Sequence, residues 1–229
     1  MCGIVGYVGT RDAVPVILEG LGRLEYRGYD SAGLAVISHG ALEMRRSVGK
    51  LVNLAKAVKA DPLSGQVGVG HTRWATHGRP SEENAHPHTD CKGRMVVVHN
   101  GIIENYLSLK ERLQGEGHTF KSETDTEVLA HLIEEQMRGN LFEAVRLALQ
   151  QVEGSYAIGV VSVDDPGRVV AARRGSPLVA GLGEGECFVA SDIPAILQAT
   201  RRIMFLEDGE LCVLSRKGIE IRDDSGKAI

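Results

Sequence analysis

Long hydrophobic runs, paired cysteines and an excess of one charge are all missing from this sequence of 229 residues. No apolar stretch approaches the ~20 residues that a membrane-spanning helix needs, and no charged segment followed by an apolar core predicts a secretory signal. The four cysteines lie far apart without a C-x-x-C pair, which argues against a disulfide framework or a cysteine zinc site. A net charge of −4 without a basic run argues against a nucleic-acid partner. We therefore expect a cytoplasmic globular protein that binds neither membranes nor nucleic acids.

Hydrophobic periodicity divides the chain into blocks of helices and blocks of strands. Helices are predicted over residues 12–26, 50–59, 105–117, 124–137 and 141–152, with a short one near 194–199. Asp12 is the expected cap of the first helix, and Thr124 and Glu127 predict a capping box at the start of the fourth. Strands are predicted over residues 3–9, 34–38, 42–48, 67–71, 95–99, 155–163, 168–173, 178–182, 187–190, 202–206, 210–215 and 218–222. The strands over 34–38 and 42–48 are expected to pair around His39-Gly40. Because helices and strands do not alternate regularly, the pattern favours antiparallel sheets with segregated helices, not a doubly wound parallel sheet.

Cys2 directly follows the initiator Met1 and opens the run Cys2-Gly3-Ile4-Val5-Gly6. Removal of Met1 would leave a thiol and a free α-amino group on one residue. The two groups titrate near ~8.5 and ~7.7–8.0, so the amine can take the thiol proton at neutral pH. The alternative is a small buried cysteine at the start of a strand. For the other three cysteines, Cys91, Cys187 and Cys212, we expect only packing.

Two histidine-rich segments lie in the long polar loop over residues 72–92, and a loop of this length is typical of a functional site. In the first, His71–Gly78, the planar guanidinium of Arg73 suits a carboxylate. Trp74 fits either a core ring or a partly exposed residue, and His71 fits a hydrogen-bonded histidine at a strand end. In the second, Asn84–His88, hydrogen bonds that fix the loop are favoured over a zinc site because a third ligand is lacking.

Three further segments offer polar groups with a structural alternative each. Asn100-Gly101, after the strand Val96–His99, is a favoured pair for a two-residue hairpin turn, or else supplies two hydrogen-bond donors to an oxyanion. Asp125 complements a helix dipole, or else binds an ammonium group. The run Glu25–Gly33, with its alternating aromatic, charged and small residues, fits a pocket wall or ordinary loop packing.

Together these motifs resemble the N-terminal-nucleophile glutaminase domain of class II glutamine amidotransferases, most closely those that use fructose 6-phosphate as ammonia acceptor. The segments that carry the resemblance span nearly the whole chain in family order: Cys2–Gly6, Leu24–Gly33, His71–Gly78, Asn84–His88, Val96–Asn105, Ser122–Val128 and Gly175–Val179. The resemblance implies an α+β fold, a four-layer αββα sandwich of two antiparallel sheets between helical layers. From the spacing of the cysteines and histidines we expect no metal, and we expect no cofactor.

The resemblance also implies a role for each matching residue. Cys2 would attack the side-chain amide of L-glutamine, with its own α-amino group as base, and Asn100 and Gly101 would hold the oxyanion. The glutamine would be bound by Arg73 through its carboxylate and by Asp125 through its ammonium group. Further pocket residues implied by the resemblance are Trp74, Thr76 and His77, with Arg27, Gly28 and His86 as supports.

The resemblance also implies a domain organisation. Residues 2–222 would form the glutaminase domain, and the polar residues 223–229 would begin a linker to a sugar-phosphate isomerase half that is not in this sequence. The isolated domain would then be monomeric within a homo-oligomeric parent. A phosphoribosyl diphosphate acceptor and a non-catalytic glutamine sensor are the two alternatives.

Overall fold

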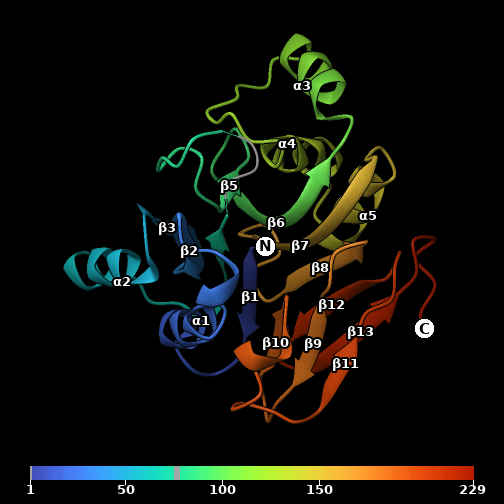
Figure 1. The fold of residues 1–229 in the computed structure, drawn as a ribbon. Coiled ribbons are helices and arrows are strands. Elements are labelled where there is room, and N and C mark those ends of the chain that lie inside the picture. The colour runs from blue at the N-terminus through green and yellow to red at the C-terminus, as the bar shows by residue number, and fades with distance from the viewer. Residues whose placement is uncertain (1, 75–77) are drawn as a thin grey trace.

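Two antiparallel sheets form the centre of the molecule in a computed structural model that describes residues 2–74 and 78–229 (Figure 1). Within these residues one sheet has the strand order β11 (Ile203–Phe205), β9 (Val179–Leu182), β10 (Cys187–Ala190), β1 (Gly3–Val8), β4 (Val67–Arg73), β2 (Ser31–Ser38) and β3 (Ala41–Val48). The other has the order β13 (Gly218–Arg222), β12 (Leu211–Ser215), β8 (Val169–Arg174), β7 (Gly154–Ser162), β6 (Met95–Ile103) and β5 (His88–Thr89).

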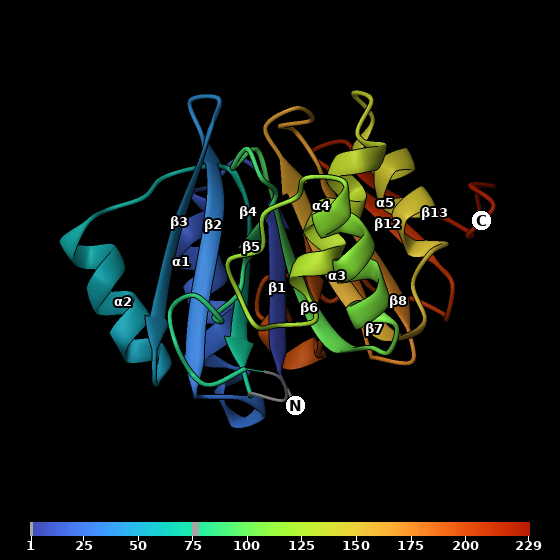
Figure 2. The same ribbon diagram turned by 90° about the horizontal axis from the view of Figure 1, so that it is seen from above.

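Helices cover the outer face of each sheet (Figure 2). The seven-stranded sheet carries α1 (Ala13–Gly22) and α2 (Leu51–Ala60), and the six-stranded sheet carries α3 (Tyr106–Gly115), α4 (Glu127–Gln136) and α5 (Leu141–Leu149). Two short 3-10 turns lie at Glu25–Arg27 and Ile193–Ala195. No helix in the described part of the chain has the length and apolar character that a bilayer span requires.

Side-chain alternation along the central strands explains why each sheet is buried on both faces. On β1, Ile4 points into the core between the sheets and Tyr7 into the core beneath α1 and α2. On β6, Val98 points between the sheets and Val97 toward α4 and α5. Three apolar layers therefore separate four layers of secondary structure, and the expected αββα architecture is confirmed.

Local sequence signals set several element boundaries as predicted. Asp12 caps α1, its side chain accepting a hydrogen bond from the Val14 N–H at 3.1 Å. His39 and Gly40 form the two-residue turn between β2 and β3 with φ values of 48° and 79°. Positive φ at both central positions is what such hairpin turns require.

Other expectations for local structure were wrong. The predicted capping box of Thr124 and Glu127 does not form, because α4 begins at Glu127 itself. The Glu127 carboxylate instead accepts hydrogen bonds from the backbone N–H groups of Lys121 at 2.8 Å and Ser122 at 2.7 Å. The helix expected over residues 194–199 is reduced to the 3-10 turn at residues 193–195.

Candidate active site

A cleft of about 320 Å³ opens where β1 and β4 of one sheet meet β6 of the other. It contains most of the residues singled out from the sequence together with several that were not. Its lining is Cys2, Arg27, Arg73, Trp74, His86, His99, Asn100, Gly101, Ile102, Thr124, Asp125, Thr126, Ser155, Ser176 and Pro177. This volume is at the lower end of the range for small-molecule sites, so the cleft suits a small polar ligand.

Cys2, which immediately precedes β1, presents its thiol to the cleft. Its Sγ accepts a hydrogen bond from the backbone N–H of Trp74 at 3.2 Å. Its carbonyl oxygen accepts from Asn100 Nδ2 at 3.0 Å and from Arg27 Nε at 3.2 Å. Burial raises the pKa of the Cys2 thiol, which the Trp74 N–H and the positive charge of Arg73 only partly offset. A base is therefore needed to form the reactive thiolate at neutral pH.

Asn100 and Gly101 lie within β6, and the hairpin turn favoured for this pair by sequence alone is wrong. The strand continues through both residues, which pair with Ala157 and Tyr156 of β7. Gly101 has a φ of 137°, and a Cβ there would overlap the Ser155 carbonyl oxygen. Only glycine fits this position, so its backbone stays open to the cleft.

His71 fixes the orientation of the Asn100 side chain. Its Nε2 lies 2.9 Å from Asn100 Oδ1 and 3.0 Å from the His99 carbonyl oxygen. Because a backbone carbonyl can only accept, Nε2 must carry the proton and donate to both oxygens. The Asn100 amide nitrogen is thereby turned toward Cys2. Burial lowers the pKa of His71 to about 3, so the ring is neutral. Sequence reasoning gave His71 no functional role.

Buried histidines in and behind the wall of the cleft form a network, named here the histidine network: His71, His86, His88 and His99. Two of its rings share one hydroxyl, because His86 Nε2 and His99 Nδ1 each lie 2.9 Å from Thr126 Oγ1. His88 Nε2 lies 3.1 Å from Thr124 Oγ1. Burial lowers the pKa of every member, so all four rings are neutral. These bonds support the loop-fixing interpretation of His86 and His88 over a zinc site.

Arg73 and Asp125 bring one charge of each sign to the cleft. Both side chains are buried. Arg73, at the end of β4, donates from Nη2 to the Gly78 carbonyl at 3.1 Å. Asp125 lies before α4, and its Oδ2 accepts from the Ile103 N–H of β6 at 2.8 Å. Opposite charges in one cleft match a ligand that is itself a zwitterion.

Arg27 and Trp74 line the cleft, and Gly28 lies against the backbone of Arg73. Arg27 is buried and pairs with Asp192 at 2.8 Å. A Cβ on Gly28 would lie 2.8 Å from the carbonyl carbon of Arg73, so glycine permits a close backbone approach there. Trp74 is half-exposed with its ring edge-on to Tyr29 at 5.5 Å, as the partly exposed alternative predicted.

Thr76 and His77 lie outside the described residues. Ser155, Ser176 and Pro177 line the cleft, although sequence reasoning gave them no role. Ser176 and Pro177 belong to a segment that carried the family resemblance, and that was the only available signal for them.

Comparison with known proteins shows the family of the chain. Residues 59–216 match the family model of the glutamine amidotransferase domain. The chain belongs to this family. Its relatives include enzymes named glutamine–fructose-6-phosphate aminotransferase (isomerizing) from Thermus thermophilus, 59% identical over all 229 residues, and from Pyrococcus horikoshii, 55% identical over 225 residues or 97% of the chain. The chain spans only 38% of the length of each of these relatives.

Solved structures of glutamine amidotransferases share the fold. A glutamine phosphoribosylpyrophosphate amidotransferase from B. subtilis superposes with a TM-score of 0.85 at 26% identity, covering 99% of this chain and 50% of that one. A class-II glutamine aminotransferase domain protein from Silicibacter pomeroyi gives a TM-score of 0.66 over 97% of this chain and 99% of that one. At 16% identity the second likeness concerns the fold alone.

Proposed function

We propose that this domain hydrolyses L-glutamine to L-glutamate and ammonia, with Cys2 as nucleophile. The observation that carries the proposal is the arrangement around one residue: the Cys2 thiol faces the cleft while the Asn100 amide nitrogen lies 3.0 Å from the Cys2 carbonyl oxygen. The nucleophile and an amide donor for the oxyanion thus occupy one cleft, together with the buried charges of Arg73 and Asp125.

The chemistry needs a processed N-terminus. Removal of Met1 frees the α-amino group of Cys2, which takes the thiol proton as Sγ attacks the side-chain amide carbon of glutamine. Asn100 and Gly101 stabilise the tetrahedral oxyanion. The carbon–nitrogen bond then breaks, the α-ammonium returns a proton to the leaving ammonia, and a γ-glutamyl thioester remains. Water hydrolyses this thioester, which releases glutamate and restores the thiol.

Binding of glutamine by the two charged groups on its α-carbon accounts for both buried charges. Arg73 pairs with the α-carboxylate and Asp125 with the α-ammonium group of the substrate. Trp74 lines the pocket, and we propose that Thr76 and His77 of the adjacent segment also contact glutamine. A site that hydrogen-bonds both head groups rejects analogues that lack either one, because the hydrogen bonds to the missing group are lost.

The acceptor of the ammonia belongs to the longer protein. We infer that a full-length parent passes ammonia to fructose 6-phosphate, in keeping with the names of relatives that are more than 50% identical to this chain. Phosphoribosyl diphosphate is the alternative acceptor, and the 26% identity of the phosphoribosyl relative supports it less. Supplying each acceptor to the full-length parent and measuring product distinguishes the two.

A glutaminase assay tests the proposed function of the domain. Purified protein, with removal of Met1 verified by intact mass, should release glutamate from glutamine. Cys2→Ala should abolish release and Cys2→Ser should reduce it severely, with both variants folded by circular dichroism. A domain that binds glutamine without turnover would instead support the sensor alternative, and turnover by Cys2→Ala would refute the mechanism.

A further inference from the structure

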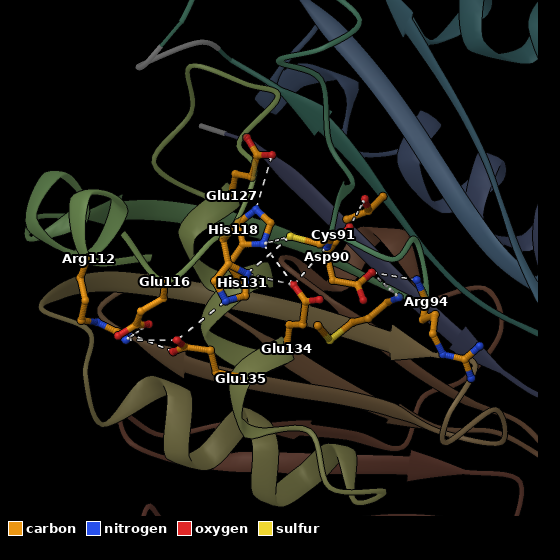
Figure 3. Close-up of polar contacts among 12 residues, drawn as sticks. Asp90, Cys91, Arg94, Arg112, Glu116, His118, Glu127, His131, Glu134 and Glu135 are labelled. Carbon is orange, nitrogen blue, oxygen red and sulfur yellow. Dashed lines mark hydrogen bonds and ion pairs between the residues drawn. The ribbon is translucent and has the colours of Figure 1, made fainter. Parts of the chain in front are cut away.

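Four side chains outside the glutamine cleft converge on one point: Cys91, His118, His131 and Glu134 (Figure 3). Cys91 lies in the turn between β5 and β6, and His118 lies in the loop between α3 and α4. His131 and Glu134 are one turn apart on α4. One ligand atom from each side chain lies within 4.8 Å of the other three.

The sulfur–nitrogen and oxygen–nitrogen separations in this cluster match edges of a coordination tetrahedron. Cys91 Sγ lies 3.5 Å from the Nδ1 atoms of both His118 and His131. Glu134 Oε2 lies 3.2 Å from His118 Nδ1 and 3.3 Å from His131 Nδ1. A tetrahedral zinc ion with bonds of ~2.3 Å to sulfur and ~2.0–2.1 Å to nitrogen or oxygen sets edges of about 3.5 Å for S···N and about 3.3 Å for N···O.

Hydrogen bonds account for only part of the arrangement, in which the Cys91 backbone N–H donates to Glu134 Oε2 at 3.1 Å. Each Nδ1 has a single in-plane lone pair or proton, yet each faces both the sulfur and the carboxylate oxygen at similar distances. Convergence of both histidines on both other groups fits a shared central atom.

The far nitrogens of the two rings face carboxylates as well. His118 Nε2 lies 3.8 Å from Glu135 Oε1, and His131 Nε2 lies 3.8 Å from Glu127 Oε1. Histidines bound to a metal commonly direct their other N–H to a carboxylate, which fixes the tautomer and raises the basicity of the ligand nitrogen. Both rings of the cluster thus have Nδ1 directed to the centre and a carboxylate behind Nε2.

We propose that Cys91, His118, His131 and Glu134 bind one Zn²⁺ ion as a structural site. One thiolate, two imidazoles and one carboxylate suit this borderline-soft ion, and four protein ligands leave no open position for a substrate. Cys91 is exposed, so an ion can reach it from solvent. The expectation that Cys91 serves only in packing was therefore wrong. The expectation of no metal rested on spacing, which cannot detect ligands 27 and 40 residues apart.

The ion would link three segments that frame the helical layer behind the cleft. It would tie the β5–β6 turn and the α3–α4 loop to α4, whose N-terminal end follows Asp125 and Thr126. We therefore expect it to stabilise the fold without entering the glutaminase chemistry. The proposal is independent of the proposed function, and its test does not require turnover.

Metal binding to the intact chain tests the site. The experiment uses Cys2→Ala protein, so that the cleft thiol cannot compete, stripped of metal by a chelator and titrated with Zn²⁺ or with Co²⁺ as a spectroscopic probe. We expect one ion per chain, a rise in Tm with Zn²⁺, and a tetrahedral cobalt spectrum with a sulfur charge-transfer band. Failure to bind stoichiometric Zn²⁺, or an octahedral cobalt spectrum, would overturn the proposal.

Matched variants locate the ion. Cys91→Ser should remove the charge-transfer band, and Cys91→Ser and His118→Ala should each weaken Zn²⁺ binding by more than about 100-fold. Glu135→Gln, behind a ligand, should weaken it by roughly 10–100-fold. The exposed residues His39 and Glu111 serve as controls, and His39→Asn and Glu111→Gln should leave binding unchanged. An unchanged band in folded Cys91→Ser protein would refute the assignment.

Discussion

Loss of the His71 donor should impair catalysis through Asn100. In His71→Leu the Asn100 Oδ1 and the His99 carbonyl oxygen, which lie 2.9 Å and 3.0 Å from the imidazole nitrogen, lose their buried donor. Leaving a buried acceptor unpaired costs about 1–3 kcal/mol. The Asn100 amide would then no longer be held with its nitrogen toward Cys2.

The size of the effect is bounded by the oxyanion donor itself. If the 1–3 kcal/mol falls on the transition state, kcat drops roughly 5- to 150-fold, at ~1.4 kcal/mol per tenfold. Asn100→Ala, which removes the donor altogether, should cost about 10²–10³ in kcat. Because His71 is proposed to act only through Asn100, kcat should respond more than the KM for glutamine.

A double-mutant cycle is the decisive assay. Glutamate release by His71→Leu, Asn100→Ala and the double variant is measured at saturating glutamine, on protein shown to be folded. The double variant should be no slower than Asn100→Ala alone, which gives a coupling energy of about 1–3 kcal/mol. His88→Leu, which removes a buried histidine bonded to Thr124, is the matched control and should not couple to Asn100. Additive losses for His71 and Asn100 would refute the positioning role.

Three further outcomes follow from the same geometry. The free energy of unfolding should be greatest above pH 6.5 and fall on acidification, by up to ~1.4 kcal/mol per pH unit for each member of the histidine network. The reason is that these rings have lowered pKa values when folded, that of His71 about 3. Urea unfolding at pH 7.5, 6 and 5 tests this, and a flat profile contradicts it. Gly101→Ala should lose activity and lower Tm, because a Cβ would overlap the Ser155 carbonyl oxygen; a fully active variant would exclude the close approach. Asp125→Asn keeps an acceptor for the Ile103 N–H but loses the charge, so kcat/KM for glutamine should fall about ten- to hundredfold; an unchanged value would exclude ammonium binding.

Sequence periodicity predicts most of the fold because the pattern of burial is local. Asp12 and the His39-Gly40 turn depend on neighbouring residues alone, and both were predicted correctly. The failures involve distant partners. Asn100-Gly101 looks like a turn, yet pairing with residues 156–157 of β7 keeps it extended. Glu127 forms no capping box because its carboxylate accepts hydrogen bonds from the backbone N–H groups of residues 121 and 122.

The candidate site was predictable where one residue type implies one chemistry, and not where proximity decides. The chemistry of Cys2 and Arg73 follows from the residue type itself, a thiol beside the N-terminus and a guanidinium that suits a carboxylate. His71 gains its role only by lying opposite Asn100 across the two sheets. Cys91 likewise shows its partners only when the β5–β6 turn folds against α4.

The cleft depends on packing between the sheets, because its two key groups come from different sheets. The bond between the Cys2 carbonyl and Asn100 joins the chain at the start of β1 to β6. Close approach of the layers has its own requirement further along β1. A Cβ on Gly6 would lie 3.3 Å from Val169 Cγ1 of the opposite sheet, and 2.6 Å from Cγ1 of Val189 on the neighbouring strand of its own sheet. A larger residue at Gly6 would separate the sheets, and a shift there would reach the oxyanion donor without any change in the residues of the cleft.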